Sequence, residues 1–188
     1  NTSIQIIDFD TEKNDIRQVL YYLSKEHPAI VGFSCYCWSM IKILDLSRLL
    51  KQHDPEIKII LGGPEAGPAA EKYLIENPAV DLIVRGEGEE TFKEVLCSFL
   101  GTGPELALTK GITYRENDGI VSTDPRPLIA NLDEIPSPYL TGILKPRDEV
   151  TYLETFRGCP YRCAFCYEGK NFPGLRFFSD ERVKKEIE

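Results

Sequence analysis

The sequence Ile57-Lys58-Ile59-Ile60-Leu61-Gly62-Gly63-Pro64 (residues 57–64) joins a mostly apolar run to a turn of two glycines and a proline. Its first part has the length and the apolar, β-branched character of a strand that is covered on both faces. The glycines and the proline then end the strand, because glycine favours turns and proline removes a backbone donor. A strand buried on both faces is typical of a parallel sheet with helices on each side.

Similar apolar runs recur along the first hundred residues and alternate with amphipathic helices. Strands are predicted at 3–8, 29–33, 57–61 and 80–84. Apolar side chains spaced three and four residues apart predict helices near 16–26, 39–52, 69–76 and 92–100. Right-handed crossovers between such strands build a three-layer, doubly wound α/β domain with a parallel sheet, of the Rossmann-like type. A further strand upstream of Asn1 fits this pattern, so we interpret the sequence as a piece of a longer protein.

The organisation changes after the last of these helices. Gly101-Thr102-Gly103-Pro104 is predicted to end the first domain, and Asn117-Asp118-Gly119 predicts a hairpin. Five prolines between residues 124 and 147 are typical of an extended linker. Residues 151–155 predict another strand, and Ser179 is a plausible N-cap of a final helix. We therefore divide the chain into an α/β domain (1–104), a hairpin with a Pro-rich linker (105–150) and a third segment (151–188).

Composition restricts the classes of function. The 188 residues carry a formal net charge of −8, which argues against a general nucleic-acid surface. A hydrophobic content of 42% with 28% charged residues is typical of a globular domain. No apolar run approaches the roughly 20 residues of a membrane span, and no secretory signal is visible. We expect a cytoplasmic protein that acts on a small molecule.

Three loops that follow predicted strands carry unusual residues: Ser34-Cys35-Tyr36-Cys37-Trp38, Gly62-Gly63-Pro64-Glu65 and Arg85-Gly86-Glu87-Gly88-Glu89-Glu90. Ligands of an open parallel sheet bind beyond the carboxyl ends of its strands. Each loop alone is also explained by turn chemistry or by a solvated charged face. Together they predict an edge that binds a large, flat or elongated ligand, since glycines let the backbone approach it closely. Neither glycine group matches the dinucleotide or phosphate-loop fingerprint.

Six cysteines are present, and half of them form a tight group with C-x3-C-x2-C spacing: Cys159, Cys163 and Cys166. Three thiolates on a short loop can hold three irons of a 4Fe–4S cluster and leave the fourth iron open. A structural zinc site needs a fourth ligand, and both histidines, His27 and His53, lie in the other domain. Spacing and ligand count therefore favour iron–sulfur over zinc, and the absence of a visible signal peptide argues against disulfides. The other thiols are expected to be buried and inert: Cys35, Cys37 and Cys97.

The triplet, with Phe165 before its last cysteine, resembles the signature of the radical S-adenosylmethionine (radical SAM) superfamily. The segments Val31-Gly32-Phe33-Ser34, Leu61-Gly62-Gly63-Pro64-Glu65 and Arg85-Gly86-Glu87-Gly88-Glu89-Glu90-Thr91-Phe92 resemble the cobalamin-binding domain that precedes the barrel in one branch of it. That branch includes the anaerobic magnesium-protoporphyrin monomethyl ester cyclase and many methyltransferases. The resemblance implies a cobalamin-binding domain, a linker and the start of a radical SAM (β/α) barrel.

The resemblance also implies the cofactors and the residues that hold them. Cys159, Cys163 and Cys166 would ligate a 4Fe–4S cluster, S-adenosylmethionine would chelate its open iron, and Phe165 would pack near the adenine. Residues of the three loops would line the cobalamin: Ser34, Tyr36, Trp38, Gly62, Gly63, Glu65, Gly86, Glu87 and Gly88. The D-x-H-x-x-G motif, which supplies a histidine to cobalt in other cobalamin proteins, is absent. No histidine from that motif is therefore expected at the metal.

These expectations describe a cobalamin-dependent radical SAM enzyme that uses an external electron donor. The cleavage of S-adenosylmethionine would drive methyl transfer or an oxidative cyclisation, and no catalytic residue is assigned. Only 22 residues follow Cys166, whereas a complete barrel needs about 200, so the chain alone is expected to be inactive. Two alternatives stay open: a radical SAM enzyme whose front domain no longer binds cobalamin, and a zinc-stabilised binding module without chemistry.

Overall fold

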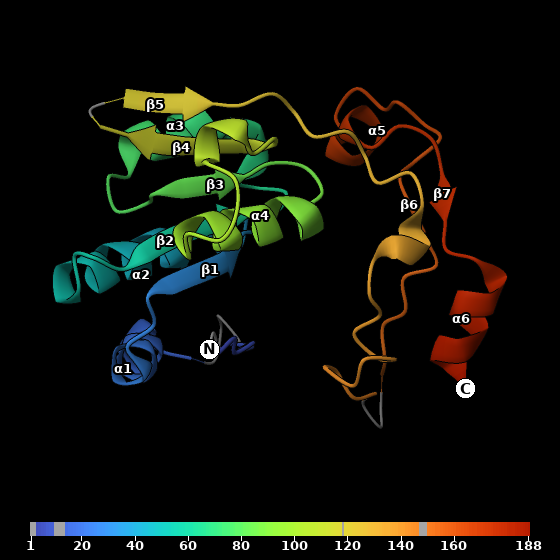
Figure 1. Cartoon of the computed structure of the whole chain (residues 1–188), viewed down its shortest axis with the longest axis horizontal. Helices are drawn as coiled ribbons and strands as arrows, with labels where there is room; N and C mark the ends of the chain where they lie inside the picture. Colours follow the sequence, from blue (N-terminus) through green and yellow to red (C-terminus); the bar gives the residue numbers. More distant parts are fainter. Residues whose placement is uncertain (1–2, 10–13, 118, 147–149) are drawn as a thin grey trace. The chain divides into compact units, whose positions relative to one another are not determined.

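The computed structural model describes residues 3–9, 14–117, 119–146 and 150–188. The chain divides into two units, Asn1–Arg126 and Pro127–Glu188 (Figure 1). The first unit holds a five-stranded sheet with its helices, and the second holds short elements around the cysteine triplet. Each unit is described by itself.

The sheet of the first unit follows the order of the chain, β1-β2-β3-β4-β5. As predicted, β1 (Ile30–Ser34), β2 (Lys58–Gly62) and β3 (Leu82–Val84) run parallel to one another. The predicted hairpin, β4 (Ile112–Glu116) and β5 (Gly119–Ser122), adds to β3 in the antiparallel direction. The sheet is therefore mixed rather than wholly parallel. The hairpin belongs to this sheet, although the sequence had grouped it with the linker.

Four helices of the first unit lie where the apolar spacing predicts them: α1 (Ile16–Glu26), α2 (Met40–His53), α3 (Ala70–Glu76) and α4 (Glu89–Phe99). The start of α1 is fixed by a capping box, in which the Asp15 carboxylate accepts from the N–H of Arg17 at 2.9 Å. The Gln18 side chain completes the box by accepting from the Asp15 N–H at 3.3 Å. Short 3₁₀ helices occupy Gly67–Ala69, Leu106–Leu108 and, in the second unit, Leu132–Glu134.

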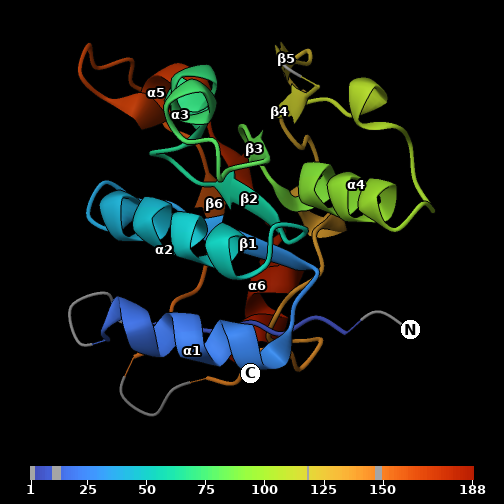
Figure 2. The same ribbon diagram turned by 90° about the vertical axis from the view of Figure 1, so that its left-hand side faces the viewer.

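Two apolar cores cover the opposite faces of the sheet. Because successive strand residues point to opposite faces, Ile59 and Ile60 of β2 belong to different cores. Ile59 packs in the core that α1, α2 and α3 build, and Ile60 packs in the core that contains Val95 of α4. Figure 2 shows α1 and α2 side by side, with α4 across the strands from α2. The predicted three-layer arrangement is confirmed.

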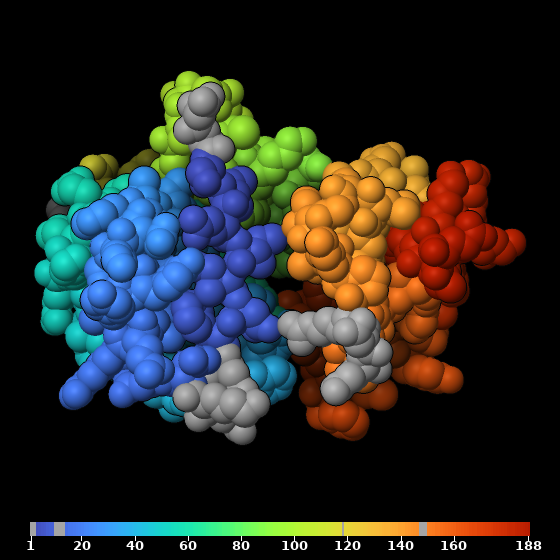
Figure 3. All heavy atoms as spheres, turned by 90° about the horizontal axis from the view of Figure 1, so that it is seen from below, coloured from blue at the N-terminus to red at the C-terminus, as the bar shows by residue number. Residues whose placement is uncertain are grey.

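Residues 3–9 do not form the strand that was predicted over 3–8. They lie along α1 instead, where the Tyr22 hydroxyl donates to Gln5 Oε1 at 3.3 Å and the rings of Phe9 and Tyr22 meet edge-on at 6.0 Å. Figure 3 shows this segment in dark blue on the surface beside the helix. A strand needs a neighbouring backbone for its N–H and C=O groups, and within the described residues no strand pairs with this segment.

Besides its 3₁₀ helix, the described residues of the second unit form an antiparallel strand pair and two α-helices: β6 (Phe156–Arg157), β7 (Arg176–Phe177), α5 (Tyr167–Asn171) and α6 (Asp180–Ile187). Ser179 caps α6 as predicted, since its hydroxyl accepts from the Arg182 N–H at 3.2 Å. The strand predicted at 151–155 is wrong, because pairing begins only at Phe156.

The start of a (β/α) barrel is not evident in the part of the chain that the structure describes. A barrel begins with a strand, a helix and a second strand parallel to the first. Here β6 and β7 pair in the antiparallel direction. Among the described residues, no helix has both the length and the apolar character that a membrane crossing requires.

Candidate functional site

The carboxyl ends of three strands meet at one edge of the sheet. Because β1, β2 and β3 are parallel, their last residues, Ser34, Gly62 and Val84, lie at the same edge. Each of the three unusual loops begins there. The fold therefore brings together the loops that the sequence singled out as a ligand-binding edge.

The loops after β1 and β2 are joined through their backbones. The Cys35 N–H donates to the Gly62 carbonyl at 2.7 Å, and the Glu65 N–H donates to the Cys35 carbonyl at 3.2 Å. Cys35 is completely buried, and this burial raises the pKa of its thiol to about 12. The thiol is therefore protonated at neutral pH and inert, as predicted. Cys37 is exposed and Cys97 is only partly buried, so the expectation of a buried thiol is wrong at Cys37 and met only in part at Cys97.

The Glu65 side chain is held by α3. The Tyr73 hydroxyl donates to Glu65 Oε1 at 2.7 Å, and this hydrogen bond raises the pKa of Tyr73 to about 12. A carboxylate stabilises the protonated phenol and opposes the charge of a phenolate. The sequence did not indicate this pair, because residues eight positions apart meet here only through the turn between β2 and α3.

The loop after β3 is anchored to the hairpin by Arg85. Its N–H donates to the Gly111 carbonyl at 2.7 Å, and one Nη donates to the carbonyls of Ile112, at 3.0 Å, and Thr123. Burial of the guanidinium lowers the pKa of Arg85. Gly86 then has φ +78°, and a β-carbon there would meet no atom within 4 Å. This loop is therefore fixed to the hairpin through Arg85, and its backbone at Gly86 is open to a ligand.

A cavity of about 510 Å³ opens beside the end of β1. Three of the predicted binding residues line it: Ser34, Tyr36 and Trp38. The rings of Tyr36 and Trp38 stack, with centroids 4.8 Å apart and planes 10° from parallel. Lys42 of α2 adds a charged wall that the sequence reasoning missed. The other predicted residues lie at the end of β2 or in the loops that follow β2 and β3. They do not line this cavity: Gly62, Gly63, Glu65, Gly86, Glu87 and Gly88.

The cavity also runs along the outer edge of β1. The Cys35 N–H donates to the Gly62 carbonyl of β2 at 2.7 Å, and the Ala29 carbonyl accepts from the Lys58 N–H of β2 at 2.9 Å. Since backbone groups alternate in direction along a strand, those of Gly32 and Ser34 point away from β2, and both residues line the cavity. Within the described residues, no strand pairs with this edge.

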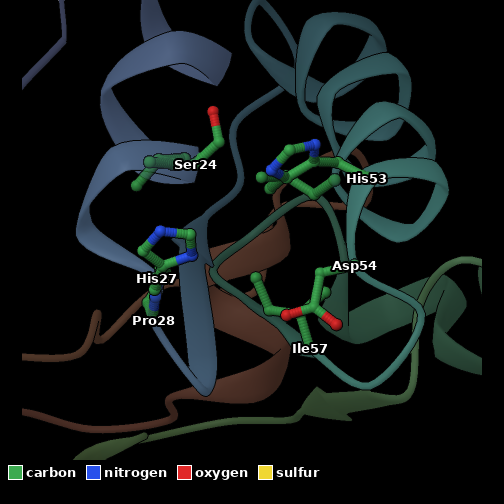
Figure 4. A pocket seen from close by; sticks show the side chains of 8 residues that line it. Ser24, His27, Pro28, His53, Asp54 and Ile57 are labelled. Atoms are coloured by element: carbon green, nitrogen blue, oxygen red, sulfur yellow. The ribbon is translucent and has the colours of Figure 1, made fainter.

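Both histidines of the chain lie at the other end of the strands. His27 precedes β1 and His53 ends α2 before β2, and the two side chains line a smaller cavity of about 190 Å³ together with Ser24 and Asp54 (Figure 4). Their exposed positions at helix ends are as predicted. Their shared cavity was missed, because it arises from the packing of α1 on α2. No histidine of this chain is therefore available at the carboxyl edge.

The cysteine triplet lies on a loop of the second unit. Cys159, Cys163 and Cys166 are all free thiols. The base of the loop is closed by hydrogen bonds from Cys159 N–H to the Phe172 carbonyl and from Gly174 N–H to the Cys159 carbonyl, both 3.1 Å. Three thiols are the donor set that an iron–sulfur cluster takes. However, within the described residues no group of three or more His, Cys, Asp or Glu side chains is arranged around a metal position.

Phe165 projects from this loop and is 94% exposed. Its predicted packing near an adenine concerns a ligand, so that assignment stays a prediction. The donors and the aromatic residue are thus present on one loop, without a preformed metal geometry.

Comparison with known proteins decides the family. Residues 1–96 match the family model of the B12 binding domain. The chain belongs to the B12-binding domain family. The match ends within α4, so it covers the three parallel strands and all three loops of the carboxyl edge.

Similar proteins are methyltransferases and a cyclase by name. The chain is 34% identical over 171 residues to the 2-(S-pantetheinyl)-carbapenam-3-carboxylate methyltransferase of Streptantibioticus cattleyicolor, with 86% of this chain and 25% of the relative covered. It is 35% identical to an uncharacterised methyltransferase of Pyrococcus horikoshii, with 98% and 41% covered. It is 30% identical to the anaerobic magnesium-protoporphyrin IX monomethyl ester cyclase of Rubrivivax gelatinosus, with 97% and 35% covered. The chain thus spans a quarter to two fifths of the length of these relatives.

Solved structures share the fold. The cobalamin-dependent S-adenosylmethionine radical enzyme OxsB, with aqua-cobalamin and S-adenosylmethionine bound, superposes with a TM-score of 0.74 at 24% identity, over 93% of this chain and 25% of that chain. The radical S-adenosylmethionine methyltransferase TsrM from Kitasatospora setae gives a TM-score of 0.67 at 17% identity, over 94% of this chain and 37% of that chain. At these identities the likeness concerns the fold alone.

Proposed function

We propose that this B12-binding domain binds cobalamin at the carboxyl edge of β1, β2 and β3, as part of a cobalamin-dependent radical SAM enzyme. The supporting observation is that three loops, two of which contain glycines, begin at one edge of the sheet. The open backbone over Gly86, where a β-carbon would meet nothing within 4 Å, fits the close approach of a large flat ligand.

The residues of this edge would bind and orient the corrin. The Tyr36–Trp38 stack and Ser34 would line it from the β1 side, and Glu65 with the backbone of the other two loops would contact it from β2 and β3. Because both histidines lie at the other end of the strands, the chain offers no imidazole to the cobalt.

The cysteine triplet would hold a 4Fe–4S cluster in the same enzyme. Cys159, Cys163 and Cys166 would ligate three irons, and Phe165 would pack near the adenine of S-adenosylmethionine. When bound and reduced by an external electron donor, these groups supply radical cleavage of S-adenosylmethionine, and cobalamin supplies a methyl carrier. The names of the relatives support methyl transfer or cyclisation as the overall reaction.

Trp38 is the only tryptophan, so its fluorescence tests the cobalamin proposal directly. Titration with hydroxocobalamin is expected to quench that fluorescence in a saturable manner, with one equivalent of corrin retained after gel filtration. If neither quenching nor a retained corrin band is seen, the front domain does not bind cobalamin and the proposal fails.

A matched pair of glycine variants locates the site. Gly86 and Gly101 both have positive φ, +78° and +68°, and a β-carbon would meet nothing within 4 Å at either. Asparagine tolerates this conformation best among the other residues. Gly86→Asn is expected to weaken cobalamin binding at least tenfold, whereas Gly101→Asn, after the end of α4, should leave it unchanged. Equal loss in both variants would contradict binding at this edge.

A further inference from the structure

The backbone of Glu65 is fixed by its neighbours, and its carboxylate is held through one oxygen while the other stays unused. Its backbone N–H is bonded to the Cys35 carbonyl at 3.2 Å, and Oε1 accepts the Tyr73 hydroxyl at 2.7 Å. The next residue, Ala66, is completely buried and fixes the turn behind the carboxylate. Oε2 accepts no hydrogen bond from the described residues. Glu65 itself is only partly buried, so this oxygen can be reached by a ligand.

We propose that Tyr73 is a positioning residue, which holds the Glu65 carboxylate so that Oε2 accepts a hydrogen bond from a primary amide on the rim of the corrin. The inference rests on the proposed cobalamin site and deepens it. It names a residue of α3, outside the three loops, on which corrin affinity depends.

The chemistry of both partners suits this contact. The rim of cobalamin carries primary amide side chains, each of which offers two N–H donors, and an ionised carboxylate accepts only. A hydrogen bond to a charged acceptor is among the stronger ones in proteins, provided the acceptor is held in place. Because the Tyr73 hydroxyl occupies Oε1, the rotation of the carboxylate is restricted and Oε2 is presented in one direction.

Two further features of the Tyr73–Glu65 pair support this contact. Tyr73 packs its ring against the core of the α1–α3 face, so the phenol is anchored by its ring. The same hydrogen bond raises the pKa of Tyr73 to about 12, and the hydroxyl is therefore a donor at neutral pH.

Hydroxocobalamin titration of Tyr73→Phe tests the inference, since this variant removes one hydroxyl and keeps the ring. The dissociation constant is expected to rise about tenfold, the loss typical of one charge-assisted hydrogen bond. Tyr114→Phe is the matched control, because Tyr114 forms a similar pair with Glu116, 3.4 Å apart, on the hairpin. That control should bind as the wild type does.

A double-mutant cycle separates positioning from general destabilisation. In a Glu65→Ala background, Tyr73→Phe is expected to cause no further loss, because there is no carboxylate left to orient. An additional loss of the same size would overturn the inference. Unchanged affinity in Tyr73→Phe would overturn it too, while leaving the proposed function intact, and a wild type that binds no corrin would overturn both.

Alkaline titration of tyrosine absorbance checks the pair without any cofactor. The wild type should contain a tyrosine with a pKa of about 12, and Glu65→Gln should lower that pKa toward 10, the ordinary value for a phenol. An unchanged titration in Glu65→Gln would show that the two side chains do not interact, and would also overturn the inference.

Discussion

Gly63 and Cys35 lie so close that a β-carbon on Gly63 would stand 2.7 Å from the Cys35 carbonyl oxygen and 2.9 Å from its nitrogen. Gly63 also has φ +100°, which side chains rarely adopt. The contact joins the loop after β1 to the loop after β2, at the edge proposed to bind cobalamin. Backbone meets backbone there, so no side-chain movement can relieve the overlap.

Gly63→Ala is therefore expected to destabilise the chain by about 3 kcal/mol, from backbone strain together with the overlap. Gly86→Ala is the matched control, because it has a positive φ without any neighbour within 4 Å. Gly86→Ala should lower the free energy of unfolding by about 1 kcal/mol, which is the backbone strain alone. Urea unfolding measures both, and equal losses in the two variants would show that the contact with Cys35 is unimportant.

Stability is expected to fall in alkaline solution. Burial raises the pKa of Cys35 from 9.0 to about 12, so above pH 9 the unfolded chain loses a proton that the folded chain retains. The free energy of unfolding is fully maintained below pH 9 and declines between pH 9 and 12, by up to about 1.4 kcal/mol per pH unit for one such group. Cys35→Ala should reduce this slope, measured by urea unfolding at several pH values, whereas Cys97→Ala should not.

The Arg85 side chain is expected to contribute more to the stability of the folded chain than an exposed arginine does. Arg85→Met leaves the carbonyl of Thr123 without its donor, and an unsatisfied buried acceptor costs about 1–3 kcal/mol. The Ile112 carbonyl keeps the Thr123 N–H as a donor at 3.0 Å. Arg48→Met is the comparison, because Arg48 pairs with Asp45 at 2.8 Å on the exposed surface of α2. That pair should contribute less than about 1 kcal/mol. A difference within error between the two variants in thermal unfolding would refute the anchoring role of Arg85.

Iron content tests the cysteine triplet. After anaerobic reconstitution, the wild type is expected to hold close to four irons and to absorb near 400 nm, whereas Cys163→Ser should hold far less iron. Cys37→Ser provides the control, since Cys37 is equally exposed but lies on the loop after β1. One zinc per chain and no iron would instead support a structural zinc module.

Local pattern predicted most of the first unit. The apolar spacing of Ile16, Val19, Leu20 and Leu23 is a property of α1 alone, and the glycines after β2 end the strand wherever it is placed. The predictions that failed concern strand pairing between segments that are distant in sequence. Residues 3–8 have a strand pattern, but no strand in the described part of the chain pairs with them. The hairpin pairs with β3 although 27 positions separate Arg85 from Ile112.

The candidate site was predictable from the sequence to about the same extent as the fold of the first unit. Parallel strands place their following loops at one edge, so the positions of Ser34, Gly62 and Gly86 follow from the strand order alone. The Tyr73–Glu65 hydrogen bond and the overlap that excludes a β-carbon at Gly63 depend on ångström-scale packing between loops. No periodicity in the sequence records such distances.

The outward-facing backbone of Gly32 and Ser34 has a practical consequence for the isolated chain. No strand of the described residues pairs with the outer edge of β1, and an unpaired strand edge is a template for strands of other molecules. Preparations of these 188 residues should self-associate as concentration rises. Quenching and unfolding experiments are therefore best interpreted at the lowest concentrations, where single molecules predominate.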